Sequence, residues 1–284
     1  MNKYMLFLLL FSLLFTACTP AATTLTETPA PVPATATSTE ILVTPTRTQT
    51  PSKTPLSTIA VNSVQLGQHP YAFQSSSGTE VRFLLYLPEN YDPHQQWPLI
   101  LFLHGRGERG MDIELIKAQP LPKLLETQSN LPFIVVSPQL PSGDWSHYID
   151  PVDELLTHLE ATLPIDSSRL YLTGLSLGGF GVWNYALRYP DRFTAIAPIA
   201  GWYIYQGEQV PEDICILSKL PIWVFHGGGD TIIEPYHSQV LVDALMACGS
   251  DVKFTLYPNV EHDIAWINAY NDPALYERFL AHTK

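Results

Sequence analysis

The sequence has little positive charge and few cysteines. Of its 284 residues, 15 are lysine or arginine and 27 are aspartate or glutamate, which gives a net charge of −12 at pH 7. A surface of that sign repels phosphate backbones, so the sequence argues against a nucleic-acid partner. Its cysteines and histidines show no metal-ligand spacing, and we therefore expect no metal site.

Long apolar runs are scarce as well. The run from Tyr4 to Phe15 is too short to span a bilayer comfortably as a permanent helix, but with a basic residue before it and small residues after it, it is typical of an export signal. The segment Phe-Thr-Ala-Cys18 resembles the lipobox of bacterial lipoproteins, in which the signal is cut before a cysteine that is then lipidated. The alternative is a plain secretory signal without a role for Cys18. Residues 1–18 thus predict an exported protein: a cell-surface or periplasmic lipoprotein held to the membrane by its lipid, or else a secreted protein.

Residues 19–58 repeat threonine, proline and alanine. Such a composition cannot bury enough apolar surface to offset the entropy of the chain, and its prolines stiffen it into extended conformations. We interpret this segment as a disordered linker between the membrane and a domain at residues 59–284. The alternative is an independent binding segment such as an O-glycosylated stalk.

The domain alternates short apolar runs with helix-like stretches. A hairpin strand is expected at 81–87, with a partner near 71–73. The apolar runs typical of strands buried on both faces are 99–103, 133–136, 170–172, 195–199, 222–225 and 252–256, and the helix-like stretches are 113–125, 152–163, 178–189 and 235–247. This alternation predicts an α/β fold: a mostly parallel sheet with helices on both faces and a site at the carboxyl ends of its strands.

One of the expected strand-to-helix loops carries a nucleophile motif, Gly174-Leu-Ser176-Leu-Gly178. A nucleophile on a sharp turn needs small neighbours because the strained backbone leaves no room for side chains. The amino terminus of the following helix then faces developing negative charge. We therefore expect Ser176 to be the nucleophile.

A serine hydroxyl needs a base to take its proton and an acid to orient that base. Asp230 follows the strand at 222–225 and His262 follows the strand at 252–256, which gives the order Ser, Asp, His. Two other acids are close by. Glu234 is expected to cap or solvate the next helix, and Asp263 adjoins the histidine too closely in the chain to face its ring. Two other histidines, His226 at a strand end and His237 inside a helix-like stretch, are interpreted as structural.

The oxyanion of the intermediate needs two backbone donors. The amide of Leu177, directly after the nucleophile, is expected to be the first. The second is expected from the loop His104-Gly-Arg106-Gly, which follows the strand at 99–103, with Arg106 preferred and Gly105 the alternative. The ring of His104 is interpreted as holding that loop together.

These motifs carry a resemblance to a known family. The segments Leu-Phe-Leu-His-Gly-Arg-Gly-Glu-Arg-Gly110, Tyr-Leu-Thr-Gly-Leu-Ser-Leu-Gly-Gly-Phe-Gly181, Phe-His-Gly-Gly-Gly-Asp230 and His-Asp-Ile-Ala-Trp266 resemble the α/β-hydrolase superfamily. They are most similar to its secreted esterases of the polyhydroxybutyrate-depolymerase, feruloyl-esterase and dienelactone-hydrolase type, which include phospholipase/carboxylesterase and prolyl-oligopeptidase-type domains. The resemblance implies an α/β-hydrolase fold and a serine hydrolase without metal or organic cofactor, with Ser176, Asp230 and His262 as its triad.

From the resemblance we expect an esterase that cleaves a small-molecule or polymer-linked ester through an acyl-enzyme. A prolyl-oligopeptidase-type peptidase is the weaker alternative, because nothing in the chain has the length or repeats of the propeller domain that such peptidases carry. A surface-binding lipoprotein that keeps the fold without turnover is the other alternative. Trp145 and Trp202 lie near strand ends and either line a substrate cleft or cover the core.

The remaining cysteines suggest one cross-link. If Cys18 is lipidated, Cys215 and Cys248 are left on either side of the strand at 222–225, in an exported and therefore oxidising setting. They are candidates for a disulfide. We expect the protein to be a monomer.

Overall fold

The computed structural model describes residues 57–58, 65–128, 130–204 and 210–284. The predicted signal peptide, Cys18 and the linker up to residue 56 lie outside the described residues. The last two residues of the predicted linker form a short strand, β1 (Ser57–Thr58), which pairs in parallel with β2. No helix in the described ranges has the length and apolar character needed to cross a membrane.

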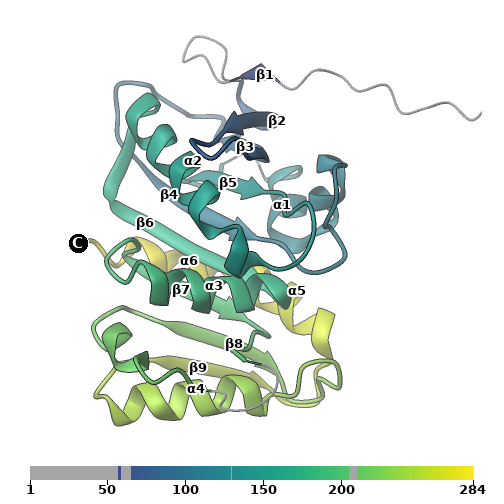
Figure 1. The fold of residues 1–284 in the computed structure, drawn as a ribbon, viewed down its shortest axis with the longest axis vertical. Helices are drawn as coiled ribbons and strands as arrows, with labels where there is room; N and C mark the ends of the chain where they lie inside the picture. The colour runs from purple at the N-terminus through teal and green to yellow at the C-terminus, as the bar shows by residue number, and fades with distance from the viewer. Residues whose placement is uncertain (1–56, 59–64, 129, 205–209) are drawn as a thin grey trace, which may run out of the picture. The chain divides into compact units, whose positions relative to one another are not determined.

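One sheet runs through the domain (Figure 1). Its further strands are β2 (Gly67–Gln74), β3 (Glu80–Leu87), β4 (Trp97–Leu103), β5 (Ile134–Pro138), β6 (Ile165–Leu175), β7 (Ala195–Ile199), β8 (Trp223–Gly227) and β9 (Lys253–Tyr257). The order is β1-β2-β3-β5-β4-β6-β7-β8-β9. The pairs β2/β3 and β3/β5 are antiparallel and all the other pairs are parallel, which confirms the predicted mostly parallel sheet.

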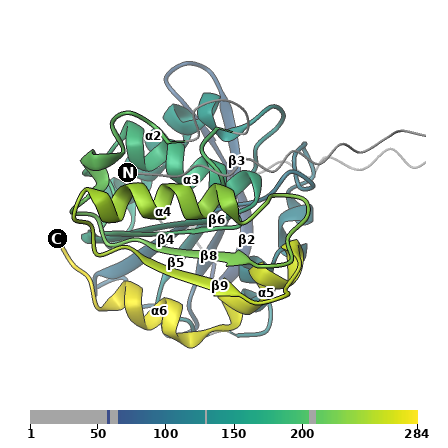
Figure 2. The same ribbon diagram turned by 90° about the horizontal axis from the view of Figure 1, so that it is seen from below.

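Helices cover both faces of the sheet, also as predicted (Figure 2). One face packs against α2 (Ile149–Thr162), α3 (Leu177–Arg188) and α4 (Tyr236–Ala247). The other packs against the 3-10 helix η2 (Ile113–Ala118), α1 (Pro120–Leu125), α5 (His262–Asn271) and α6 (Pro273–Leu280). Two short 3-10 helices, η3 (Trp145–His147) and η4 (Ile214–Leu217), lie in loops.

The central strand β4 shows why its sequence is apolar throughout. Every residue of β4 is buried. Leu99 and Leu101 point into the core under α2, α3 and α4, whereas Ile100 and Phe102 point into the core under α1, α5 and α6. Since successive side chains of a strand face opposite ways, a strand covered on both faces needs apolar residues at every position.

The structure corrects the predicted helices in two places. The predicted helix at 113–125 is divided into η2 and α1 at Gln119, whose backbone is extended with ψ at 149°. Pro120 causes this break, because a proline disfavours the helical conformation of the residue before it. The second difference is at the C-terminus, where α5 and α6 were not predicted. His262 is therefore the first residue of a helix and does not lie in a loop.

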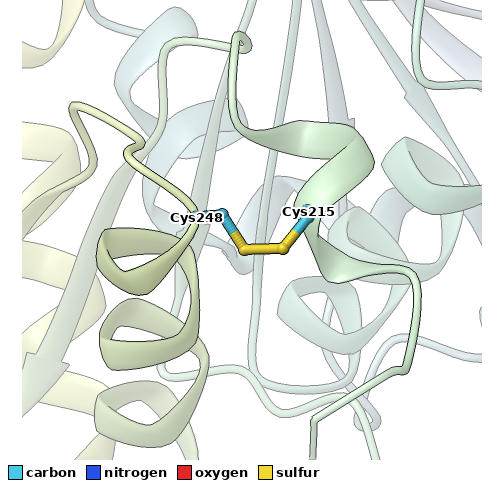
Figure 3. The surroundings of a disulfide bond; sticks show 2 residues. All are labelled: Cys215 and Cys248. Carbon is cyan, nitrogen blue, oxygen red and sulfur yellow. A yellow bond between two sulfur atoms is a disulfide. The ribbon is translucent and has the colours of Figure 1, made fainter.

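A disulfide joins Cys215 and Cys248 (Figure 3). Cys215 lies in η4 and Cys248 directly follows α4, and their Cα atoms are 5.4 Å apart. The bond therefore ties the segment before β8 to the end of the helix that follows β8.

Candidate active site

Ser176 occupies the sharp turn between β6 and α3. Its φ of 53° and ψ of −117° lie outside the regions that residues with a side chain commonly adopt. Two backbone hydrogen bonds hold the turn. The Ser176 amide donates to the carbonyl of Ile199 in β7 at 2.9 Å, and the Ser176 carbonyl accepts from the Phe180 amide at 3.0 Å. This geometry leaves the hydroxyl partly exposed at the carboxyl end of the sheet.

The two glycines of the motif are required by close backbone contacts. A Cβ on Gly174 would lie 2.7 Å from the backbone of Gly178, and one on Gly178 would lie 1.9 Å from the carbonyl oxygen of Leu103. No side chain fits at these distances, so the spacing of glycines around Ser176 follows from how tightly α3 turns back over β4 and β6.

A chain of hydrogen bonds links Ser176 to Asp230 through His262. The His262 Nε2 atom lies 2.9 Å from the Ser176 hydroxyl oxygen. The His262 Nδ1 atom is hydrogen-bonded to Oδ2 of Asp230. Asp230 and His262 are 4% and 5% exposed, so both lie in an interior where such bonds are weakly screened by water. The rival acids Glu234 and Asp263 are exposed to solvent.

Four donors surround the Asp230 carboxylate. Its Oδ1 accepts from the amides of Ile232 at 3.0 Å and Ile233 at 2.9 Å. Its Oδ2 faces ring nitrogens of both His262 and His226. Burial alone would raise the pKa of Asp230, but the hydrogen bonds from His226, His262 and the Ile233 amide hold that pKa well below its usual value. The carboxylate is therefore ionised at neutral pH.

Three glycines bring Asp230 and His262 together. A Cβ on Gly227 would lie 2.2 Å from the Val260 carbonyl oxygen. The amides of Gly228 and Gly229 donate to the carbonyls of Tyr257 at 2.7 Å and Val260 at 2.9 Å. The loop after β8 thus packs directly on the loop before α5, and this contact places the Asp230 carboxylate beside the His262 ring.

The loop after β4 is held from several sides. The His104 ring is fully buried; its Nδ1 lies 2.7 Å from the Gly105 carbonyl, and its Nε2 accepts from the Leu140 amide at 2.9 Å. These partners require a proton on Nδ1 and none on Nε2. Because the Nδ1 proton holds the Gly105 carbonyl, the amide of Arg106 in the same trans peptide points the opposite way. Among the described residues, the amides of Arg106 and Leu177 have no hydrogen-bond acceptor.

Of the two positions expected for Trp145, lining a substrate cleft or covering the core, the structure shows the second. Trp145 is 1% exposed, and its indole nitrogen donates to the His104 carbonyl at 3.1 Å. It packs so closely on α3 that a Cβ on Gly181 would lie 2.8 Å from it. Trp145 therefore supports the loop after β4 from the interior. Trp202 is partly exposed and packs on Phe180, with ring centres 5.6 Å apart.

A cavity of about 410 Å³ lies on the α5 side of the site. Residues between 118 and 127, from the end of η2 through α1 to the segment after it, form one wall, and residues of α5 form the other. Trp266 belongs to this lining, and its ring meets the ring of His262 edge to face with 4.7 Å between ring centres. The sequence offered no signal for this cavity, because α5 was not predicted.

Comparison with solved structures identifies the fold. The chain superposes on the crystal structure of a thermostable esterase with a TM-score of 0.65 and 27% sequence identity, covering 77% of this chain and 64% of that one. The chain has an α/β-hydrolase fold. Residues 144–267 of the chain match the model of the phospholipase/carboxylesterase family.

Two curated relatives are similar to parts of the chain. A putative carboxymethylenebutenolidase of Yersinia pestis is 32% identical over 107 residues, which is 34% of this chain and 38% of that protein. A probable feruloyl esterase C of Aspergillus clavatus is 25% identical over 156 residues, which is 53% of this chain and 57% of that protein. The matched parts thus span about two fifths to three fifths of the relatives' length.

Proposed function

We propose that this α/β-hydrolase is a serine esterase in which Ser176 is the nucleophile, His262 the general base and Asp230 the acid that orients the base. The observation that carries the proposal is the pair of hydrogen bonds of His262, to the Ser176 hydroxyl at 2.9 Å and to the Asp230 carboxylate. The esterases among its relatives and structural neighbours support the same chemistry.

In the proposed reaction, His262 Nε2 takes the hydroxyl proton while the Ser176 oxygen attacks the ester carbonyl carbon. The tetrahedral intermediate collapses when the protonated His262 gives its proton to the alkoxide, which leaves as an alcohol. The acyl group is then bound to Ser176. A water molecule gives a proton to His262 and attacks the acyl carbon, which releases the acid and returns the proton to the Ser176 oxygen.

The oxyanion of each tetrahedral intermediate is proposed to bind the amides of Leu177 and Arg106. The absence of other acceptors for these two amides among the described residues supports this assignment. The Leu177 amide belongs to the first turn of α3, where the helix dipole also favours negative charge. The His104 ring holds the Gly105 carbonyl, so the Arg106 amide of that peptide is directed away from the ring and is left for the oxyanion.

The substrate is proposed to be a carboxylic ester of a small molecule or of a polymer. The printed names of the relatives include a feruloyl esterase and a poly(3-hydroxyalkanoate) depolymerase, which differ in acyl group. The partly exposed Trp202 and the cavity beside Trp266 are candidate contacts for the acyl or alcohol part.

Hydrolysis of p-nitrophenyl acetate by the parent and by Ser176→Ala tests the function. The parent should release p-nitrophenol, and the variant should retain about a thousandth of the parental rate or less. Equal rates of hydrolysis by the parent and the variant would contradict the assignment of Ser176 as the nucleophile. A panel of acetylated xylan, feruloyl, hydroxybutyrate and simple acyl esters then defines the acyl preference.

The same assays separate the two alternatives. A prolyl-oligopeptidase-type peptidase would cleave a proline-containing peptide, whereas an esterase would leave such a peptide intact. A binding lipoprotein without turnover would bind an ester but release no product. We expect cleavage of esters and no cleavage of the peptide.

We also propose that the protein is exported and that Cys18 carries a lipid. The apolar run and the sequence before Cys18 support this proposal. In a bacterial host, the parent should incorporate a labelled fatty acid and fractionate with membranes, and Cys18→Ser should lose both properties. Labelling that is equal in parent and variant would contradict lipidation at Cys18.

A further inference from the structure

We propose that His226 is a positioning residue that fixes the Asp230 carboxylate in the orientation that His262 needs. The proposal rests on the proposed function, since it concerns the acid of the same triad. His226 lies in β8 with its side chain fully buried, four residues before Asp230. In the sequence alone, this residue cannot be distinguished from an ordinary core histidine.

The surroundings of the ring define which nitrogen carries the proton. The Nε2 atom lies 3.2 Å from Oδ2 of Asp230 and 2.9 Å from the carbonyl oxygen of Ile233. Both neighbours are acceptors, so Nε2 must carry a proton. That proton is hydrogen-bonded to the Ile233 carbonyl, and the N–H group also lies beside the same carboxylate oxygen that His262 contacts, close enough to help lower the pKa of Asp230.

Ser238 of α4 completes this arrangement on the other side of the ring. Its hydroxyl oxygen lies 2.7 Å from Nδ1 of His226 and 3.3 Å from the Gly201 carbonyl. With Nε2 protonated, the shorter contact is satisfied in a neutral ring when the serine hydroxyl donates to Nδ1. The two acceptors at Nε2 thus select the tautomer of His226, and the Ser238 hydroxyl is placed to complete it at Nδ1.

The result is a carboxylate with no freedom to rotate. Oδ1 is held by the amides of Ile232 and Ile233, and Oδ2 is held by the two histidine rings. Without His226, Oδ2 would be directed by His262 alone, and a buried carboxylate would lose one of its compensating donors. The acid could then turn away from the base in part of the population.

Other charged groups near His226 must be held constant in a test. His237 of α4 is close enough for the two rings to influence each other electrostatically, and Glu234 acts on His237 in the opposite sense. Asp230 and His262 complete the titratable groups in contact with this cluster. The test therefore changes His226 alone.

Two amide substitutions separate the donor from the size of the side chain. In His226→Gln the side-chain amide reaches the position of Nε2 and keeps a donor toward Asp230. In His226→Asn the amide reaches only the position of Nδ1, toward Ser238, and the donor to Asp230 is lost. The exposed His147 provides the matched control, His147→Asn.

Kinetics on p-nitrophenyl acetate give the first readout. In H226N, kcat should fall about tenfold or more with little change in KM. The acid limb of kcat/KM should move to higher pH, because a carboxylate with one donor fewer attracts a protonated His262 ring more strongly. H226Q should recover most of kcat and the parental pH profile. Equal losses in both variants, or parental behaviour in H226N, would overturn the proposal.

NMR gives two readouts that do not need turnover, and the first is made on the parent alone, so it does not depend on whether H226N folds. In the parent, the ring nitrogens of His226 should show Nε2 protonated and Nδ1 bare, and the opposite tautomer would overturn the proposal. The low-field proton between His262 and Asp230 should shift in H226N and not in H226Q. If the parent hydrolyses no ester but these signals behave as stated, the proposed function fails and the role of His226 stands.

Discussion

The carbonyl oxygen of Leu103 lies where a side chain on Gly178 would begin, 1.9 Å from the position of a Cβ on that glycine. Leu103 is the last residue of β4 and precedes the loop that carries Arg106, while Gly178 directly follows Leu177 in α3. The contact therefore sets the spacing between the two amides proposed to bind the oxyanion.

Gly178→Ala is expected to destabilise the protein by at least about 3 kcal/mol, because the methyl group overlaps the backbone and α3 must move away from β4. Chemical denaturation of parent and variant measures this change. Gly107→Ala is the matched control, since nothing lies within 4 Å of a Cβ at that position. Equal stability of the two variants would show that the close approach is not as described.

His104 is expected to make stability depend on pH. Burial lowers the pKa of His104 from 6.5 to about 4, against the hydrogen bond to the Gly105 carbonyl, which raises it. Between these two values the unfolded chain binds a proton that the folded chain excludes. The contribution of His104 to the free energy of unfolding should therefore fall by about 3 kcal/mol as the pH falls from 6.5 to 4.

Urea denaturation at several pH values checks this contribution. His104→Gln should lose less stability than the parent across this pH window, although it starts from a lower value at pH 7. His147→Asn, which alters an exposed histidine, should follow the parent. If the free energy of unfolding of His104→Gln falls with pH as steeply as that of the parent, groups other than His104 cause the loss of stability in acid.

The disulfide between Cys215 and Cys248 is expected to stabilise the domain. It closes a loop of 33 residues, for which the chain-entropy relation gives about 3 to 4 kcal/mol. The double substitution to serine should lower the free energy of unfolding by about this amount. A reductant should destabilise the parent and leave the double variant unchanged. Free thiols in protein isolated without reductant would contradict the bond.

Trp145 and Trp202 are expected to affect different kinetic constants. Trp145→Phe removes the indole donor to the His104 carbonyl, so stability and kcat should fall while KM for p-nitrophenyl acetate changes little. Trp202→Ala should instead raise KM for aryl esters, because its partly exposed ring is the proposed contact for the substrate. Steady-state kinetics of both variants measure the split, and a KM effect confined to Trp145→Phe would reverse the two assignments.

Much of the fold could be predicted because its signals are local. Continuous apolar runs, such as that of 195–199, indicate strands buried on both faces, and the glycines around Ser176 indicate a strand-to-helix turn. The order of Ser176, Asp230 and His262 follows the order of the strands that precede them. Each of these signals lies within a few residues of the feature it predicts.

What could not be predicted depends on contacts between distant segments. Gly227 packs on the Val260 carbonyl, and this contact places Asp230 beside His262. It is visible only in three dimensions. The same holds for the buried position of Trp145, since the sequence left a substrate cleft and the core equally open for this residue. The helix that begins at His262 was missed because its apolar residues show no clear period along the chain.

Trapping of the acyl-enzyme tests the central claim most directly. The parent is mixed with p-nitrophenyl acetate, quenched in acid within the first turnovers, digested and analysed by mass spectrometry. We predict one acetyl group per chain on Ser176, and none in Ser176→Ala. Two results would contradict the account. One is an acetyl intermediate on a residue other than Ser176, and the other is hydrolysis by the parent without any acetylated Ser176.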